Sequence, residues 1–365
     1  MNTKIENNPY FINQISANGL LGKREINWEL QRVNVLVGPN GCGKSTILKL
    51  IHEALLGPDY DIAGQDFVGK YDDFQVTLSN GMASKLNVGS SEHANAMVKE
   101  LISTAMSDGS FSDYDDERKE VLSKIFEAIN NNPTSIKFNG NLSSGKADFI
   151  TFNGPNGKTI NKLTNNVNVE YISTFDMLML SKEEQDEYSS KGELYSQLDV
   201  MIKKELNKLS RLILKLTNKS SENYKPRKSG GILKHHSKYL SSVNNFLDKI
   251  NELLSSENKK VSIESDGNLT ITYLGKEIKT NYLSSGEKQL LFVLLKVLNS
   301  TNKPAIIMLD EPEISMHLKW QEGLLDAITT IHPNSQIIVA SHSPAIVMKG
   351  WINNLVDIDE ITITK

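Results

Sequence analysis

The 365-residue chain lacks several features that would assign it to a special class of protein. Its single cysteine, Cys42, excludes an internal disulfide and is typical of a reducing cytoplasm. No apolar run approaches the roughly 18 residues of a membrane span, and the polar N-terminus does not resemble a signal peptide. The net charge of -4 indicates no global affinity for nucleic acid, so any basic surface has to be local. We therefore expect a cytoplasmic protein without a membrane partner.

The composition is that of an ordinary globular protein. Charged residues make up 23% of the chain and hydrophobic residues 39%. A chain of this length can bury a full core and can hold two domains. We find no internal repeat and no low-complexity tract, so the organisation of the chain has to be inferred from local patterns.

The most informative stretch is a glycine loop between a predicted strand, residues 33–37, and a predicted helix, residues 47–56. The loop matches G-x-x-x-x-G-K-[ST], the pattern in which backbone N–H groups surround a phosphate at a helix N-terminus. Lys44 would reach the β- and γ-phosphates, and the Ser45 hydroxyl would bind Mg²⁺. The predicted nucleotide-binding residues of this loop are Gly38, Pro39, Asn40, Gly41, Cys42, Gly43, Lys44, Ser45 and Thr46.

Two strand-like stretches precede the loop, at residues 10–15 and 24–30, with glycines between them. They predict a hairpin that leads into the loop strand. Tyr10 or Phe11 would be able to stack on an adenine, but we favour the interpretation of a half-buried strand aromatic.

The middle of the chain is predicted to be an insertion. Residues 61–180 mix strand and helix patterns and are expected to form an inserted α/β part. Residues 181–260 contain two amphipathic helix patterns, which predict a projecting helical hairpin arm. Residues 201–240 hold eleven Lys or Arg and two Glu, a local charge of +9. This charge indicates either a contact with nucleic acid or an acidic partner, or a solvated helix face, and we weigh the two equally.

A second polar motif, residues 283–289 (Leu-Ser-Ser-Gly-Glu-Lys-Gln), opens an apolar helix pattern. Serine and glycine at a helix start present N–H and hydroxyl donors to an anion. The letters Leu-Ser-Ser-Gly also occur at residues 142–145, but there no helix pattern follows, and we interpret that copy as a hairpin turn. The predicted nucleotide-binding residues of the second motif are Ser284, Ser285, Gly286 and Glu287.

Two apolar strand patterns near the C-terminus end in polar side chains. Residues 305–309 form an uninterrupted apolar run, typical of a parallel strand buried on both faces. Asp310 at its end would hold Mg²⁺ through water, and Glu311 would polarise an attacking water. Residues 336–341 form the next strand, and His342 after it would bond a γ-phosphate. The predicted catalytic residues are Glu311, His342 and Lys44, and the predicted metal-binding residues are Ser45 and Asp310.

These pieces, in this order, resemble the ATP-binding-cassette (ABC) ATPase superfamily. The matching segments are residues 38–46 (Walker A), 283–289 (signature), 306–311 (Walker B) and 341–344 (switch histidine). The resemblance implies an α/β P-loop ATPase head with a mixed, mainly parallel sheet flanked by helices, formed by residues 1–60 and 261–365. It also implies ATP and Mg²⁺ as cofactors, ATP hydrolysis, and a head-to-head ATP-sandwich dimer. In that dimer the Walker A loop of one protomer faces Ser285 and Gly286 of the other.

The length of the insertion indicates which branch of the superfamily the chain resembles. Lys44 and Ser284 are separated by 239 residues, more than in a transporter cassette and fewer than in chromosome-maintenance (SMC) proteins. Residues 309–318 together with 341–344 resemble the overcoming-lysogenisation-defect (OLD) branch. That branch includes the ATPase subunits of anti-phage systems such as Septu, PARIS and some retrons. Only 23 residues follow His342, too few for the Toprim domain of OLD nucleases. The resemblance therefore implies that a nuclease or toxin effector is a separate protein.

The chain departs from the superfamily pattern in two places. Residues 171–176 follow a predicted strand where the Q-loop should begin, but they contain no glutamine, which leaves the second magnesium contact unassigned. Cys42 stands where serine or alanine is usual, and its similar size explains why it is tolerated.

We therefore expect an ATP-hydrolysing subunit that regulates a separate effector in a bacterial anti-phage complex. Two alternatives stay open. The first is a DNA repair or recombination ATPase of the SMC type, acting on DNA through the basic hairpin. The second is a slow-turnover scaffold that bound ATP stabilises. A transporter subunit fits least, because the insertion is too long and contains no recognisable coupling surface.

Overall fold

The computed structural model describes residues 8–21, 24–56, 71–90, 135–139, 146–153, 163–173, 196–221, 230–264 and 267–364. The chain divides into two compact units. Unit 1 contains Met1–Arg32, Gly38–Val169 and Val356–Lys365, and unit 2 contains Val33–Val37 and Glu170–Leu355. Each unit is described below by itself.

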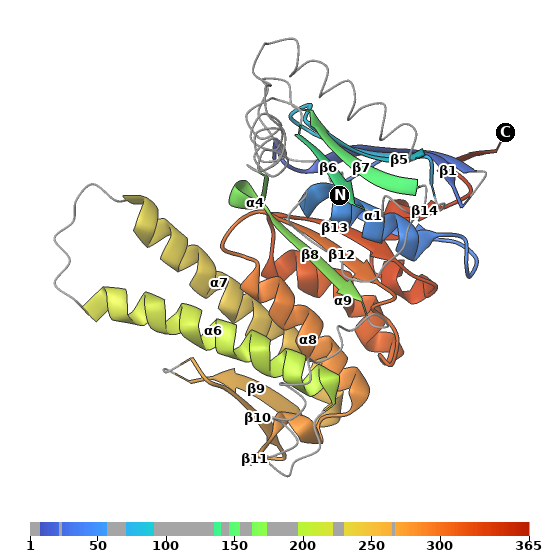
Figure 1. The fold of residues 1–365 in the computed structure, drawn as a ribbon. Coiled ribbons are helices and arrows are strands. Elements are labelled where there is room, and N and C mark those ends of the chain that lie inside the picture. Colours follow the sequence, from blue (N-terminus) through green and yellow to red (C-terminus); the bar gives the residue numbers. More distant parts are fainter. Residues whose placement is uncertain are drawn as a thin grey trace, which may run out of the picture. The chain divides into compact units, whose positions relative to one another are not determined.

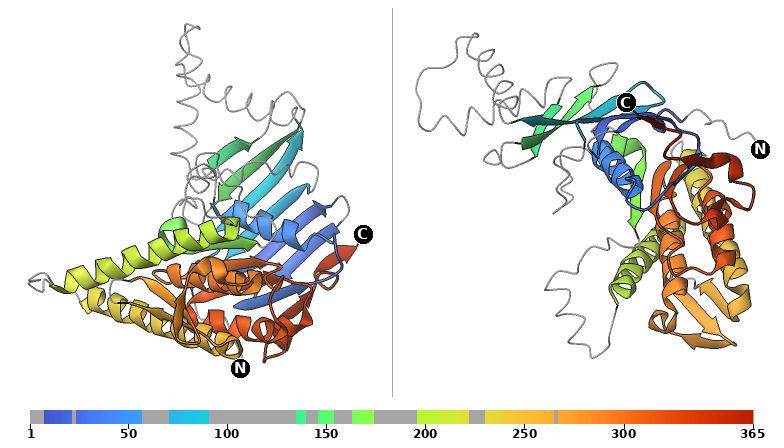
Figure 2. Two further views of the ribbon diagram at one scale, coloured as in Figure 1. Left: turned by 90° about the horizontal axis from the view of Figure 1, so that it is seen from below. Right: turned by 90° about the vertical axis from the view of Figure 1, so that its right-hand side faces the viewer.

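Unit 1 is built on a seven-stranded sheet in which every neighbouring pair is antiparallel (Figure 2). In spatial order its strands are β15 (Thr362–Thr364), β2 (Arg24–Glu29), β1 (Ile12–Leu20), β4 (Asp73–Leu78), β5 (Ala83–Ser90), β7 (Lys146–Asn153) and β6 (Ser135–Asn139). The predicted hairpin at residues 10–30 is confirmed by the pairing of β1 with β2. The predicted turn at 142–145 lies outside the described residues, but the strands that flank it, β6 and β7, pair as in a hairpin.

Helix α1 (Lys44–Leu56) packs on this sheet, and α4 (Leu163–Asn166) is a short helix of the same unit. The apolar residues of α1 recur at helical spacing and are fully buried from Ile47 to Leu55. Strand β4 shows the alternation of a sheet with one buried face, because Phe74, Val76 and Leu78 are buried. The Ser84 hydroxyl of β5 donates to the Ala54 carbonyl at 2.8 Å and joins the helix to the sheet.

Unit 2 is organised by a five-stranded sheet (Figure 1). Its strands, in spatial order, are β14 (Leu355–Asp357), β3 (Val33–Val37), β13 (Ser335–Ala340), β12 (Ala305–Asp310) and β8 (Asn168–Ser173). The three central strands, β3, β13 and β12, are parallel. Every residue of β12 and β13 is buried, as expected for strands covered on both faces.

Helices and a small second sheet complete unit 2. Its α-helices are α6 (Gln197–Ser221), α7 (Gly230–Leu253), α8 (Ser285–Asn299) and α9 (Leu318–Ile331). Its short 3-10 helices are η2 (Leu254–Glu257), η3 (Thr280–Tyr282), η4 (Pro344–Val347) and η5 (Ile352–Asn354). The small antiparallel sheet contains β11 (Lys276–Ile278), β10 (Leu269–Tyr273) and β9 (Lys259–Ile263), so the predicted hairpin around Gly267 is confirmed.

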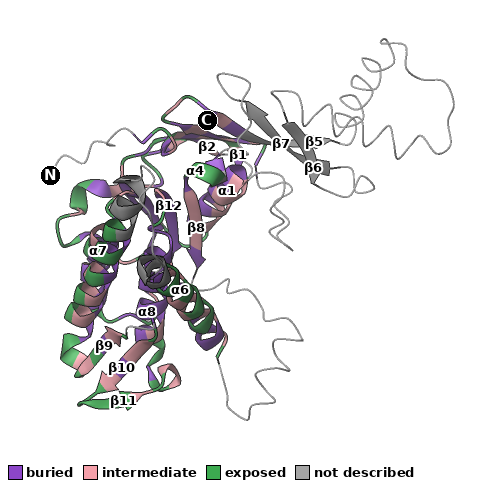
Figure 3. Cartoon of the chain, turned by 90° about the vertical axis from the view of Figure 1, so that its left-hand side faces the viewer, coloured by how far each residue is buried: buried purple, intermediate pink, exposed green. Residues whose placement is uncertain are grey.

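The two long helices of the predicted arm share the core of unit 2. The predicted apolar stripes are confirmed, because Leu198, Ile202 and Leu209 of α6 are buried in the same cluster as α8 and α9. Phe246 and Ile250 of α7 are fully buried there too. Figure 3 shows buried, intermediate and exposed positions following one another along α7, as expected for a helix with one covered side. These stripes of α6 and α7 pack against α8 and α9 of the same unit, and the projection of the hairpin arm stays a prediction.

The fold is α/β with a mixed, mainly parallel sheet flanked by helices, as predicted for a P-loop ATPase head. The predicted domain boundaries stay a prediction. Backbone pairing of β1 with β4 joins residues on both sides of the predicted boundary at residue 60, a pairing that local patterns do not encode.

Candidate functional site

The glycine loop belongs to unit 1 and begins where β3 ends. Gly41 has φ +74° and Gly43 has φ +105°. A residue with a Cβ would be strained in these backbone conformations, so glycine is required at both positions. A Cβ at Gly38 would come within 2.6 Å of Cγ2 of Ile358. The loop continues directly into α1, whose first residue is Lys44. This is the strand–loop–helix arrangement that a phosphate-binding loop needs.

Lys44 lies inside its own loop. The side chain is 4% exposed, and Nζ donates to the carbonyl oxygens of Gly38 at 3.0 Å and Pro39 at 3.2 Å. Cys42 is buried, and its Sγ lies 3.9 Å from Nζ. Arg24 of β2 donates to the Cys42 carbonyl at 3.0 Å and supports the loop from the sheet. A small side chain fits at position 42 because it is enclosed between these groups.

The other loop residues differ in accessibility. Pro39, Asn40 and Gly41 are exposed, whereas Ser45 and Thr46 at the start of α1 are half-buried. Phe11 is 3% exposed in the core of unit 1, so it is not available to stack on adenine, and Tyr10 is half-buried. The favoured interpretation of a strand aromatic therefore agrees with the structure for Phe11.

The predicted catalytic carboxylates lie in unit 2 at the C-terminal edge of its parallel strands. The register places Asp310 beside Ala340, and Ala340 beside Leu36, so the three strands end level with one another. Asp310 is 3% exposed, and its Oδ2 accepts a hydrogen bond from the Tyr171 hydroxyl at 2.9 Å. Tyr171 is in β8, at the position where the Q-loop was expected to begin.

Glu311 and His342 form a pair. His342 Nε2 lies 3.1 Å from Glu311 Oε1, and the side chains are 38% and 11% exposed. Glu311 has φ +49°, an uncommon left-handed conformation for a residue with a side chain. Such conformations persist where surrounding contacts hold them, and they concentrate at functional sites. The geometry therefore brings together the two residues that the sequence predicts for the γ-phosphate and the attacking water.

Glu313 holds the segment around the histidine, and sequence reasoning missed it. Its Oε1 accepts hydrogen bonds from the Ser341 hydroxyl at 2.5 Å, from His342 N at 2.8 Å and from Ser343 N at 3.0 Å. Gln321 Oε1 accepts from the Ser343 hydroxyl at 2.6 Å. The available signal was a third carboxylate two residues after Glu311, separated from it by Pro312. In the structure Glu313 is 8% exposed.

The signature motif begins helix α8 with a reciprocal capping box. The Ser284 hydroxyl accepts from Glu287 N at 3.3 Å, and Glu287 Oε2 accepts from Ser284 N at 2.8 Å. Lys259 of β9 donates to both Glu287 oxygens at 2.6 and 2.7 Å, so the 3% exposed carboxylate is engaged within the protein. Ser284 and Ser285 are exposed. The contacts therefore give Glu287 a helix-capping role, whereas the two serines are accessible to a ligand.

Gly286 is buried against the loop that follows β12. A Cβ at this position would collide with the backbone carbonyl oxygen of Ser315, which has φ +64°. The absence of a side chain at Gly286 therefore permits the close approach of α8 to this loop.

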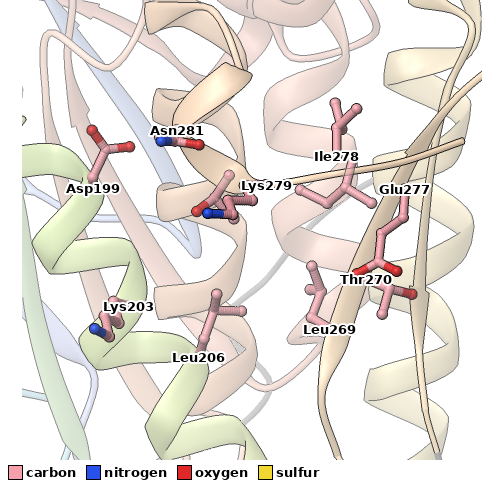
Figure 4. Close-up of a pocket in the computed structure, with 11 residues that line it drawn as sticks. Asp199, Lys203, Leu206, Leu269, Thr270, Glu277, Ile278, Lys279 and Asn281 are labelled. Carbon is pink, nitrogen blue, oxygen red and sulfur yellow. The ribbon is translucent and has the colours of Figure 1, made fainter. Parts of the chain in front are cut away.

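A separate cavity of about 300 Å³ lies in unit 2 between α6 and the segment that leads into α8 (Figure 4). Apolar side chains of Leu206, Leu269 and Ile278 line it, together with the charged side chains of Lys203 and Glu277. None of the predicted nucleotide-binding residues lines this cavity.

In the described part of the chain, no group of three or more His, Cys, Asp and Glu side chains is placed to hold a metal ion. None of the described helices combines the length and apolar character that crossing a membrane requires.

Two curated relatives match parts of the chain. "Retron Vc95 probable ATPase" of Vibrio cholerae serotype O1 biovar El Tor is 28% identical over 151 residues, 38% of this chain and 28% of the relative. "Septu protein PtuA" of Bacillus thuringiensis is 31% identical over 109 residues, 26% of this chain and 28% of the relative. The chain thus spans less than a third of the length of each relative.

Solved structures that align with this chain include SMC head domains. A crystal structure of the SmcHead bound to the C-winged helix domain of ScpA has a TM-score of 0.47 at 14% identity. The alignment covers 95% of this chain and 93% of that chain. The SMC head domain from Thermotoga maritima has a TM-score of 0.44 at 13% identity, over 95% and 94%.

A family model covers most of the chain. It matches residues 33–348 and is described as "AAA domain, putative AbiEii toxin, Type IV TA system". This stretch contains the glycine loop, helix α8, strand β12 and His342. The chain therefore belongs to this AAA domain family, and the curated relatives confirm the resemblance to ABC-type ATPases of the anti-phage defence type.

Proposed function

We propose that the protein binds Mg-ATP and hydrolyses it in a head-to-head dimer. The glycine loop would bind the phosphates, with Lys44 releasing its own loop carbonyls to reach the β- and γ-phosphates. Ser45 and Asp310 would hold Mg²⁺, which supplies neutralisation of phosphate charge when bound. Backbone N–H groups and the exposed Ser284 and Ser285 of the other protomer would complete the site.

The observation that carries this proposal is the pairing of Glu311 with His342 at 3.1 Å. Glu311 would accept the proton of the attacking water, and His342 would donate to the γ-phosphate. Glu311 and His342 follow strands β12 and β13, which end level with β3 at one edge of the sheet. The last residue of β3 is Val37, and Gly38, the first residue of the glycine loop, follows it in the chain.

The proposed biological role is regulation of a separate effector, a nuclease or toxin, in a bacterial anti-phage complex. The family description and the names of the two curated relatives support this role. A cytoplasmic location is part of the same proposal. A slow-turnover scaffold makes a different prediction, because it would keep its biological activity without hydrolysis.

The first test compares Glu311→Gln with the wild-type protein. We expect ATP binding to persist, phosphate release to fall by about 100-fold or more, and an ATP-dependent dimer to accumulate in light scattering. Glu264→Gln, an exposed carboxylate of unit 2, is the matched control. Full turnover by Glu311→Gln would overturn the assignment of the catalytic base.

The second test isolates the protein with its partners. A tagged chain from its native host should copurify with a nuclease-like or toxin-like protein at a fixed ratio, as judged by mass spectrometry and light scattering. Phage protection that survives in Glu311→Gln would favour the scaffold. A tagged chain that copurifies with no partner and gives the host no protection against phage would contradict the proposed regulation of an effector.

A further inference from the structure

Helix α6 presents an outer face that is almost purely cationic. Of its residues between Gln197 and Lys215, the exposed ones are Lys203, Lys204, Asn207, Lys208, Arg211, Leu214 and Lys215. Five of these seven are basic and none is acidic. The side chains of Lys204, Lys208, Arg211 and Lys215, which we call the basic face, follow one another at steps of four, three and four residues. Those steps place them on one side of the helix.

The acidic residues of the same helix turn inward, which the sequence did not reveal. Asp199 is 4% exposed and pairs with Lys288 Nζ of α8 at 2.8 Å. Glu205 is half-buried, and its Oε2 accepts from Asn299 of α8 at 2.7 Å. Both carboxylates therefore contribute to the packing of α6 on α8.

Most apolar residues of α6 are buried in the core and are not available to a partner. Leu198, Ile202, Leu209 and Ile213 are buried in the core of unit 2. Leu214, 41% exposed, is the one large apolar side chain on the outer face of the described part of α6. Protein interfaces usually need a buried apolar centre with aromatic or aliphatic anchors. The basic face, with four cations and a single leucine near it, is therefore better matched to a polyanion than to a protein.

We propose that the basic face of α6 binds the phosphate backbone of a nucleic acid. At 1.5 Å per residue, Lys204 and Lys215 are about 16 Å apart along the axis. That length allows the side chains to reach several phosphates of a nucleic-acid backbone. Contacts of this kind are independent of sequence, and arginine adds a bidentate phosphate contact. The inference does not depend on ATP hydrolysis.

The test measures the binding of fluorescent duplex DNA and duplex RNA to the full chain across a salt series. The variant is the triple charge reversal Lys208→Glu, Arg211→Glu and Lys215→Glu. The control reverses three exposed lysines elsewhere in unit 2, Lys260→Glu, Lys276→Glu and Lys319→Glu, so that the net charge is matched. If the α6 reversal unfolds the protein, the neutral triple Lys208→Gln, Arg211→Gln and Lys215→Gln replaces it.

We expect the wild-type protein to bind with a steep salt dependence. The α6 variant should lose roughly tenfold or more in affinity, and its log–log salt slope should be less steep by about 3. The control should keep the wild-type slope. Equal losses in both variants, or no binding by the wild type, would overturn the proposal. Stronger binding of polyglutamate than of nucleic acid would assign the face to an acidic protein and would also overturn it.

Discussion

Glu313 Oε1 accepts the backbone N–H of His342 at 2.8 Å, and the same oxygen accepts from the Ser341 hydroxyl and Ser343 N. One buried carboxylate oxygen thus receives three donors from three successive residues. The imidazole of His342 extends from this anchored segment to Glu311. Because Glu313 accepts hydrogen bonds from the segment that carries His342, we assign it as a positioning residue.

Glu313→Gln should lower kcat by about tenfold, because an amide cannot hold three donors as a carboxylate does. The KM for ATP should stay within about twofold, since the anchor acts on the histidine and not on binding. The decisive measurement is a double-mutant cycle with His342→Ala. In that background Glu313→Gln should cost nothing further. Additive losses would show that Glu313 acts on the fold and not through His342.

Gly286→Ala should disturb the start of α8, because its Cβ would meet the Ser315 carbonyl. We expect a loss of about 1–3 kcal/mol in the free energy of unfolding in urea, together with weaker ATP-dependent dimerisation. Gly323→Ala is the matched control within helix α9 of the same unit. Its Cβ would meet Cδ2 of Leu253, a flexible side chain that can shift, so the loss should be smaller. A larger loss at Gly323 would contradict the argument.

Tyr171→Phe removes the hydroxyl that donates to Asp310 at 2.9 Å. If Asp310 helps to hold Mg²⁺, loss of this supporting bond should raise the Mg²⁺ concentration for half-maximal hydrolysis by about tenfold. Saturating Mg²⁺ should restore the rate. Tyr273→Phe, at an exposed position of β10, should leave the magnesium titration unchanged. If Tyr171→Phe leaves the magnesium titration unchanged, Tyr171 does not support metal binding by Asp310.

Tyr239→Phe should leave the protein as stable as the wild type or stabilise it by about 1 kcal/mol. The Tyr239 hydroxyl is buried and has no hydrogen-bond partner in the part of the chain that the structure describes. Burial also raises the pKa of this hydroxyl above its ordinary value, because the phenolate would be poorly solvated. Thermal and urea unfolding would measure the change. A loss above 1 kcal/mol would indicate a partner for this hydroxyl.

Local patterns were sufficient for the elements that carry the predicted site. The buried strand before Gly38, the helix after Lys44 and the helix at Ser285 all appear where the sequence predicts them. Hydrophobic periodicity and glycine positions are local properties, so they can be interpreted without a partner strand. The sharing of one sheet by β1 and β4 was not predicted, because that pairing joins segments more than 50 residues apart. Strand β5, which pairs with β4 close by in the chain, was not predicted either.

The sequence by itself determined the order and chemical type of the site residues, from Lys44 through Asp310 and Glu311 to His342. The tertiary structure decided which groups support them. It brought Glu313 to the switch segment, Tyr171 to Asp310 and Lys259 to Glu287. It also turned Asp199 and Glu205 inward and left the outer face of α6 basic. The physical reason is that such contacts depend on strand register and helix packing across more than 25 residues of chain, whereas residue type and spacing act locally.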